Sequence, residues 1–137
     1  MSKPDSGYFT GTSGQGKALI DEVIARGDKI SPDKVLLITR DPQGRIIWLE
    51  TGNSASGFQH IIEKHEHEFN GAGISNDDIP GYILVAVCQG NIVGTQGKRD
   101  LRTIYEFVYN GETRRVAVQV SSNGYIVSAN PKSMEGK

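Results

Sequence analysis

Residues 102–130 read RTIYEFVYNGETRRVAVQVSSNGYIVSAN, in which two Asn-Gly pairs separate segments rich in β-branched and aromatic residues. Asn-Gly favours the left-handed backbone of a tight hairpin turn. The pattern therefore predicts three strands, over residues 102–109, 114–120 and 125–130, that follow one another as an antiparallel meander. This C-terminal sheet is the element that decides the fold.

The residues before the meander carry mainly helical patterns. Apolar spacing predicts helices at 17–27 and about 54–70, and a turn at 41–44 predicts a hairpin between 33–39 and 45–50. Residues 79–89 favour a helix with Pro80 in its first turn, although their apolar centre fits a strand equally well. The fold class is thus α+β, with N-terminal helices packed on a C-terminal antiparallel β-sheet. We expect a flexible leader over residues 1–15 and a single domain over residues 16–137.

Composition supports one ordinary globular domain. The chain has 137 residues, of which 36% are hydrophobic and 23% charged, and its single cysteine excludes an internal disulfide framework. No apolar run is long enough to anchor the chain in a membrane, and the first residues show no signal-peptide pattern. The net charge is −1, but residues 41–80 hold seven acids and two bases, whereas residues 98–137 hold seven bases and four acids. The meander is therefore a basic segment within a neutral total.

Two motifs suggest chemistry that the surrounding sequence does not support. Gly11 to Lys17 match the start of a phosphate-binding loop, but no buried strand precedes them and Ala18 stands where Ser or Thr would bind magnesium. A flexible leader is the favoured interpretation. His60, His65 and Cys88 lack the spacing of a zinc site, because ligands on one helix face are four residues apart. We therefore predict no metal ligand and disfavour a metal-dependent DNase.

His65 has an unusual position in the second predicted helix. Helical spacing places it on one stripe with Phe58, Ile61 and Phe69, where an aliphatic side chain would pack better. One interpretation is a core histidine bonded to a backbone carbonyl. The other is a desolvated imidazole at a cleft, with His60 one turn away, and such a pair could serve as general acid and general base.

Strand alternation identifies further polar side chains in places that favour apolar packing. Arg114 shares a face with three valines of its strand, and either reaches solvent at the sheet edge or contacts a phosphate. Ser128 and Asn130 alternate with Ile126 in the same way. Thr103 and Tyr125 are additional hydroxyl donors on the meander.

Two segments resemble a known nuclease family. Residues 52–65, GNSASGFQHIIEKH, are followed by Phe69 and Ile79-Pro80, and residues 123–131 read NGYIVSANP. Both are similar to the phage-type branch of the barnase/EndoU/colicin/RelE-like (BECR) nucleases, over roughly residues 45–131. Lys64 stands where Arg is usual in this family, and Asn130 where an aromatic residue is common.

The resemblance implies a metal-independent endoribonuclease without cofactors. In such enzymes the RNA 2′-hydroxyl attacks the adjacent phosphodiester, which requires a base, an acid and groups that stabilise the phosphorane. His65 and His60 are assigned to the proton transfers, in an order that the sequence does not decide. Arg114 is assigned to charge stabilisation, and Ser128, Tyr125 and Thr103 to hydrogen bonds with the phosphate. The substrate-binding residues expected on the basic meander are Lys98, Arg99, Arg102, Arg115 and Asn130.

The resemblance also implies a biological setting. Domains of this family occur in phage proteins and as C-terminal toxins of contact-dependent growth-inhibition systems. The toxins are exported within a larger effector protein and usually cleave tRNA in the cytoplasm of a competing bacterium. A cognate immunity protein blocks them in the producing cell, and some work with elongation factor Tu. The alternative is a non-catalytic phage or structural binding module of the same fold.

Overall fold

The computed structural model describes residues 8–97 and 101–132 and has an α+β architecture. The helical elements are α1 (Gly14–Ala25), the 3-10 helices η2 (Pro32–Lys34) and η3 (Asn76–Asp78), α2 (Phe58–Gly71) and α3 (Ile79–Gln89). The strands are β1 (Val35–Arg40), β2 (Ile46–Glu50), β3 (Asn91–Gln96), β4 (Arg102–Tyr109), β5 (Glu112–Val120) and β6 (Ile126–Lys132). The predicted fold class, with helices before a C-terminal antiparallel sheet, is confirmed.

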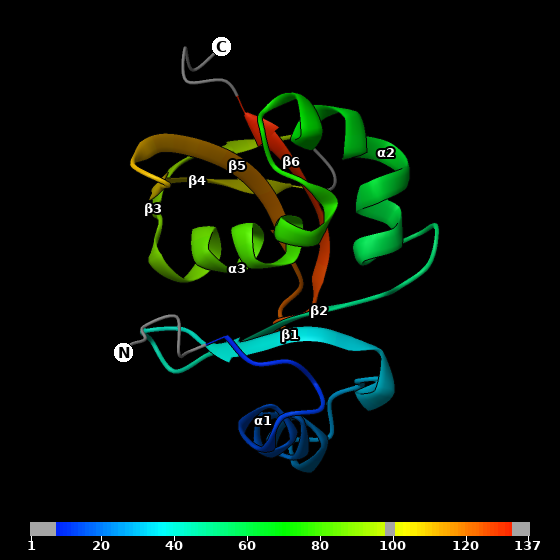
Figure 1. The fold of residues 1–137 in the computed structure, drawn as a ribbon. Helices are drawn as coiled ribbons and strands as arrows, with labels where there is room; N and C mark the ends of the chain where they lie inside the picture. Colours follow the sequence, from blue (N-terminus) through cyan, green and yellow to red (C-terminus); the bar gives the residue numbers. More distant parts are fainter. Residues whose placement is uncertain (1–7, 98–100, 133–137) are drawn as a thin grey trace.

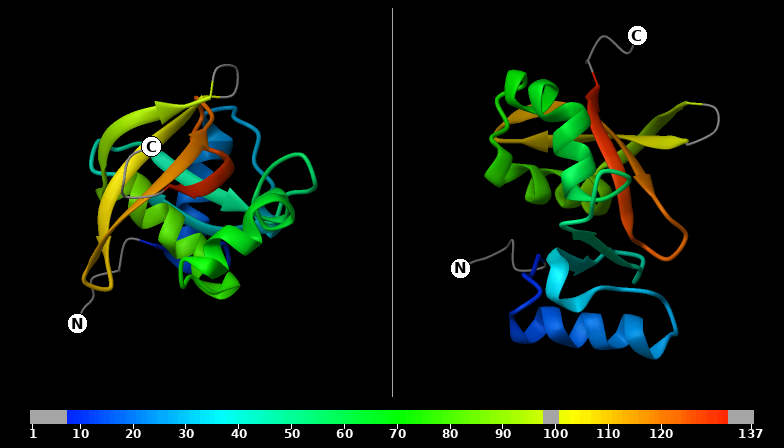
Figure 2. Two further views of the ribbon diagram at one scale, coloured as in Figure 1. Left: turned by 90° about the horizontal axis from the view of Figure 1, so that it is seen from above. Right: turned by 90° about the vertical axis from the view of Figure 1, so that its right-hand side faces the viewer.

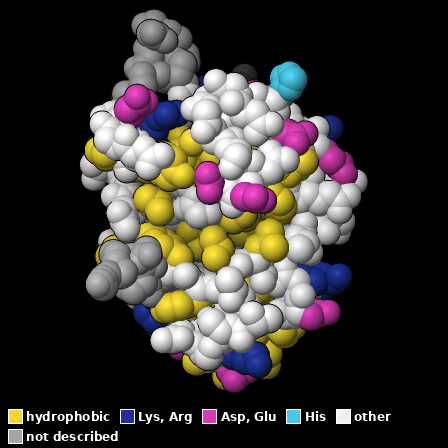
Figure 3. All heavy atoms as spheres, in the orientation of Figure 1, with side chains coloured by type: hydrophobic (Ala, Val, Ile, Leu, Met, Phe, Trp, Pro, Cys, Tyr) yellow, Lys and Arg dark blue, Asp and Glu magenta, His cyan; other side chains and the backbone are white. Residues whose placement is uncertain are grey.

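The elements form two stacked parts. Figure 1 shows α1 under the β1–β2 hairpin, and above the hairpin the sheet β3-β4-β5-β6 with α2 and α3. The side view in Figure 2 shows the same order from another direction. Figure 3 shows apolar and acidic side chains across the middle of one face, with Lys and Arg at its margins.

Strand β2 connects the two parts because its side chains alternate between two cores. Ile47 and Leu49 belong to the larger core with α2, α3 and the four-stranded sheet, whereas Ile46 and Trp48 belong to the smaller core under α1. The backbone N–H of Trp48 also donates to the carbonyl of Gly124 at 3.0 Å. The hairpin is therefore a shared layer between the two cores.

Turn chemistry fixes the three predicted hairpins. The side chain of Asp41 accepts hydrogen bonds from the backbone N–H groups of Gln43 and Arg45, which closes the β1–β2 turn. Asn110 has φ 51°, as the predicted β4–β5 turn requires, and the second Asn-Gly pair lies in the β5–β6 turn. Residues 79–89 are helical as predicted.

Two elements differ from the sequence-based prediction. Helix α2 begins at Phe58 rather than near residue 54, because the Asn53 side chain accepts from two backbone N–H groups and holds residues 53–56 in a turn. Strand β3 was not predicted, since it is an edge strand whose side chains are largely exposed and which contains Gly94.

Residues 8–15, expected in the flexible leader, have defined positions. Phe9 exchanges two backbone hydrogen bonds with Ile38, at 2.8 and 3.0 Å. The Ser13 hydroxyl accepts from the backbone N–H of Gly16 and caps α1. Because Tyr8 and Phe9 pack against the larger and the smaller core, respectively, the ordered structure starts before residue 16.

Candidate functional site

The four-stranded sheet has one apolar face and one polar face. Tyr105, Phe107, Val116 and Val118 belong to the core formed with α2 and α3. Successive side chains of a strand point to opposite sides of a sheet, so the residues that alternate with these core residues along β4, β5 and β6 lie on the other side. That side carries mainly polar and charged side chains, at Gln96, Arg102, Glu106, Arg115, Gln119, Ser128 and Asn130.

A contact between the two edge strands shows that this polar side is concave. In a flat sheet β3 and β6 would be three strand spacings apart, about 14 Å. The side-chain amide of Gln96 on β3 nevertheless donates to Asn130 Oδ1 on β6 at 3.2 Å. The sheet must therefore curl toward this side, which we call the concave face.

Arg102, the first residue of β4, reaches across to β6 on the concave face. Its Nη1 donates to Asn130 Oδ1 and its Nη2 donates to Ser128 Oγ, both at 3.1 Å. Its Nε is buried and has no hydrogen-bond partner among the described residues. The Nε of Arg114 is buried and unpaired in the same way, so this feature by itself does not mark a ligand site.

A second charged pair lies on the same face. Arg115 Nε donates to Glu106 Oε2 at 2.9 Å, and both side chains are partly exposed. Lys132 is the neighbour of Arg115 in the β5–β6 register and adds another cation. This part of the sheet therefore presents two cations and one carboxylate that could accept a proton.

The concave face unites four of the residues predicted for the site: Arg102, Arg115, Ser128 and Asn130. Glu106 and Gln96 belong to it as well and were not predicted. The sequence holds a signal for Glu106, because the predicted hairpin pairs it with Arg115 and paired residues point to the same side of a sheet. Gln96 had no comparable signal, since its strand was not recognised.

Arg114 lies on the opposite side of the sheet. Arg114 and Gln119 are five residues apart in β5, so their side chains lie on opposite sides of the sheet. Ser128 is paired with Gln119 and therefore lies on the side away from Arg114. The Nη1 of Arg114 donates to the carbonyl of Ala72 at 2.8 Å, at the end of α2, and its Nη2 pairs with Glu112. Burial raises the pKa of Tyr82, and the nearby Arg114 guanidinium partly opposes this shift. Arg114 thus joins a helix end to the sheet and does not meet Ser128.

The two predicted histidines lie on α2. His60 Nδ1 is 2.8 Å from the carbonyl of Ser54, and His65 Nδ1 is 3.0 Å from Glu68 Oε2. The His65 side chain is 19% exposed, whereas Ile61 and Phe69 on the predicted stripe are fully buried. His65 therefore lies at the margin of the packed stripe, paired with a carboxylate of its own helix.

The remaining predicted residues are dispersed. The Tyr125 hydroxyl is 2.8 Å from Ser56 Oγ, and the Tyr125 ring packs edge-on against Trp48. Thr103 is opposite Val118 on the side of the sheet that faces the helices. Burial raises the pKa of Tyr105, and a hydrogen bond with Thr103 partly opposes this shift. Lys98 and Arg99 lie outside the described residues. The residues predicted as one catalytic group thus occupy several locations.

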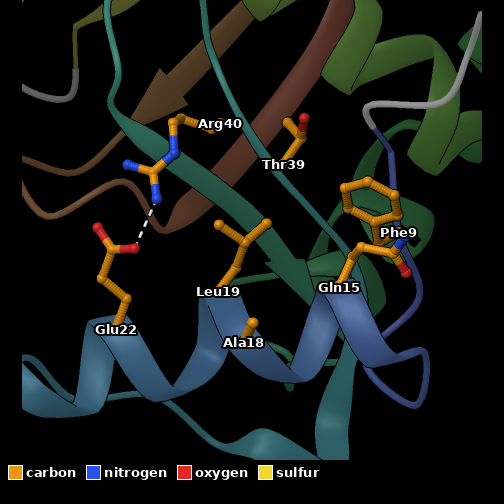
Figure 4. Close-up of a pocket in the computed structure, with 7 residues that line it drawn as sticks. All are labelled: Phe9, Gln15, Ala18, Leu19, Glu22, Thr39 and Arg40. Carbon is orange, nitrogen blue, oxygen red and sulfur yellow. Dashed lines mark hydrogen bonds and ion pairs between the residues drawn. The ribbon is translucent and has the colours of Figure 1, made fainter.

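Two of the cavities in the described part of the chain bear on the predicted site, and both lie away from the concave face. A polar cavity of about 570 Å³ has Tyr125 in its wall. A smaller one of about 350 Å³ lies between α1 and β1, where Phe9, Leu19 and Ala18 form much of its lining. Figure 4 shows the Arg40–Glu22 ion pair at one side of this smaller cavity, which contains none of the predicted site residues.

Within the described ranges, no three His, Cys, Asp or Glu side chains gather as a metal site would require. In the same part of the chain, no helix has both the length and the apolar composition needed to cross a membrane. No protein-family model and no curated protein sequence matches the chain.

Proposed function

We propose that the chain is a metal-independent endoribonuclease that binds the RNA phosphate on the concave face of its C-terminal sheet. The observation that carries this proposal is the Arg102 guanidinium, anchored by Ser128 and Asn130 on the same face of the sheet as the Arg115–Glu106 pair. Guanidinium groups match the geometry of phosphate oxygens, and held in place by neighbours they stabilise the charge of a phosphorane.

The same face holds a group suited to proton transfer. A carboxylate such as Glu106 can take the proton of the attacking RNA 2′-hydroxyl, which leaves a 2′,3′-cyclic phosphate when the 5′-oxygen departs. Arg115 bonds Glu106 and so fixes the orientation of its carboxylate. No group on the concave face is assigned to the proton that the leaving oxygen needs. His65 and His60 lie on α2, which packs against the opposite face of the sheet, so their contribution is a separate test.

The proposed substrate is tRNA, and the proposed role is that of a toxin domain. The concave face adds a local group of cations to a chain whose net charge is −1. A limited basic surface of this kind suits a compact RNA better than a long polyanion, whose affinity grows with the number of phosphates contacted. In this role the domain is delivered within a larger effector into the cytoplasm of a competing bacterium. An immunity protein is its partner in the producing cell, and elongation factor Tu is a further candidate partner.

The test is cleavage of total bacterial tRNA by the purified chain in the presence of EDTA. We expect cut fragments with cyclic phosphate ends, and Arg102→Ala should lower the cleavage rate about a hundredfold, as loss of a phosphorane-stabilising donor does. Arg102→Lys, which keeps the charge, and Glu106→Gln, which keeps a hydrogen-bonding group, test the same face with less risk to folding.

Arg40→Ala is the matched control, because it removes one arginine from the β1–α1 side of the molecule and should leave the rate unchanged. His65→Ala and His60→Ala show whether α2 takes part. Full activity of an Arg102→Ala, Arg115→Ala double variant that is folded by circular dichroism would contradict the site. No cleavage of tRNA by the unmodified chain would contradict the enzyme.

The second candidate function is a binding module without catalysis. It is favoured by the mutual hydrogen bonds of Gln96, Asn130, Arg102 and Ser128, which resemble a surface organised for packing or recognition. It predicts that RNA binds without being cut, so the same gel, combined with a filter-binding measurement, separates the two functions.

A further inference from the structure

The polar cavity lies where three loops meet, at the junction of the hairpin and the sheet. Its volume is about 570 Å³, within the range of small-molecule sites. The α1–β1 connection, the β2–α2 loop and the β5–β6 turn form its wall together with Glu50 at the end of β2. The lining residues include Lys29, Lys34, Asn53, Asn123 and Tyr125. The concave face shares none of these residues.

Backbone hydrogen bonds hold the three loops together without a ligand. The N–H of Thr51 donates to the carbonyl of Lys34 at 2.9 Å, and the N–H of Gly57 donates to the carbonyl of Val127 at 2.9 Å. The hydroxyl groups of Ser56 and Tyr125 bond to each other between the second and third loops. The cavity is therefore preorganised, which lowers the entropic cost of binding.

Within residues 8–97 and 101–132, the side-chain NH₂ groups of the two asparagines in the wall have no hydrogen-bond partner. Asn53 Oδ1 accepts from the N–H groups of Ala55 and Ser56, at 2.8 and 3.2 Å. Asn123 Oδ1 accepts from the N–H of Tyr125 at 3.1 Å and from the Ser121 hydroxyl. Since each carbonyl oxygen is already engaged, the side-chain NH₂ groups are what the asparagines can offer to a ligand.

The charges of the wall also favour a ligand rich in acceptors. Lys29 and Lys34 are exposed, and Glu50 is the single acid among the lining residues. Glu50 Oε2 is occupied by the N–H of Ser31 at 3.1 Å and by the indole N–H of Trp48 at 2.9 Å. Two cations and several neutral donors thus remain for binding.

We propose that this cavity binds one phosphorylated nucleotide, with the phosphate at Lys29 and Lys34. Asn53 and Asn123 donate to acceptors of the base or ribose, and the partly exposed ring of Tyr125 offers a surface on which a base can stack. As a site for a flanking nucleotide of the RNA substrate this assignment rests on the proposed function, but nucleotide binding itself can be measured without any cleavage.

The experiment is titration of the full chain with adenosine 5′-monophosphate, followed by calorimetry and by ¹⁵N NMR shifts. We expect saturable binding, with the largest shifts at residues 29–34, 53–56 and 121–125. A Lys29→Ala, Lys34→Ala double variant should bind at least about tenfold more weakly, because charge-assisted hydrogen bonds to the phosphate are lost. Asn53→Asp keeps the oxygen that the turn needs but removes the NH₂ donor and adds a negative charge, so it should weaken binding similarly.

A Lys17→Ala, Lys64→Ala double variant is the matched control, since it removes the same charge outside the cavity and should bind normally. The chain is also titrated with inorganic phosphate and with adenosine, and each of these ligands should bind more weakly than the nucleotide. Phosphate binding as tightly as the nucleotide, equal binding by the Lys29/Lys34 variant, or no saturable binding would each overturn the assignment. Saturable nucleotide binding by the unmodified chain, together with no cleavage of RNA by that same chain, would remove the proposed function and leave the cavity assignment standing.

Discussion

Cys88 illustrates how burial sets the chemistry of a single side chain. It lies near the end of α3, and burial, with a smaller contribution from the Asp41 carboxylate, raises the pKa of its thiol to about 12. An unfolded chain would release this proton near the ordinary cysteine pKa of about 8.5. Between these two values the folded state binds more protons than the unfolded state, so the stability of the fold decreases as the pH rises.

We therefore predict that the urea midpoint of unfolding is lower at pH 9.5 than at pH 7.5. At pH 9.5 the tyrosines are still below their ordinary pKa of about 10, so most of the change should come from the thiol. The measurement is urea unfolding of the unmodified chain and of Cys88→Ser at both pH values. The decrease should be clearly smaller in Cys88→Ser, and an equal decrease in both proteins would assign it to other groups.

At the scale of elements, the β5–β6 turn is fixed by its contact with β2. Gly124 has φ +104°, and a Cβ at this position would lie 1.9 Å from the backbone carbonyl of Ile46. Gly44 in the β1–β2 turn has a similar φ of +91°, but nothing lies within 4 Å of its Cβ position. The two glycines thus share the backbone conformation and differ in the space around them.

Gly124→Ala should therefore destabilise the protein more than Gly44→Ala. Both substitutions carry the cost of a positive φ, about 1 kcal/mol, but only the first also forces β2 and the turn apart. Urea unfolding of the two variants measures the difference. Equal losses of stability would mean that the turn moves away from β2 at little cost.

The elements that the sequence predicted are those in which local chemistry and tertiary packing agree. The Asn-Gly turns and the Asp41 turn have side chains or backbone angles that specify them locally, so the hairpins were predictable. Strand β3 was not, because its partner β4 stabilises it and its exposed side chains show no alternation. Residues 8–15 have a loop-like composition, and only the pairing of Phe9 with Ile38 fixes their position.

The sequence also predicted part of the candidate site, but not its geometry. Strand parity identifies Ser128 and Asn130 as polar side chains on one face, and the basic meander supplies Arg102 and Arg115. The curl of the sheet that joins Gln96 to Asn130 is a property of four strands together and has no local signal. The register between β5 and β6, which decides which side chains share a face, also has no signal within either strand. It pairs Ser128 with Gln119, so the sheet separates Ser128 from Arg114, which bonds to the end of α2.

At the scale of the whole molecule, β2 makes the two cores depend on each other. Its five residues are all buried, and its side chains point alternately into the core under α1 and into the core around α3. Unfolding either core would expose one side of β2 to water and remove packing from the other. The two stacked parts are therefore expected to unfold together.

Trp48, the single tryptophan, reports on the smaller core, whereas far-ultraviolet circular dichroism reports on all helices and strands. We predict that urea unfolding followed by both signals gives one coincident transition.

Two matched substitutions probe the coupling: Ile38→Val in the smaller core and Ile83→Val in the larger core, both at fully buried positions. Each should cost about 1 kcal/mol, the usual cost of removing one buried methyl group. Because β2 belongs to both cores, each substitution should lower the midpoint equally for both signals. A Trp48 transition that responds to Ile38→Val but not to Ile83→Val would show instead that the hairpin and α1 unfold as a separate unit.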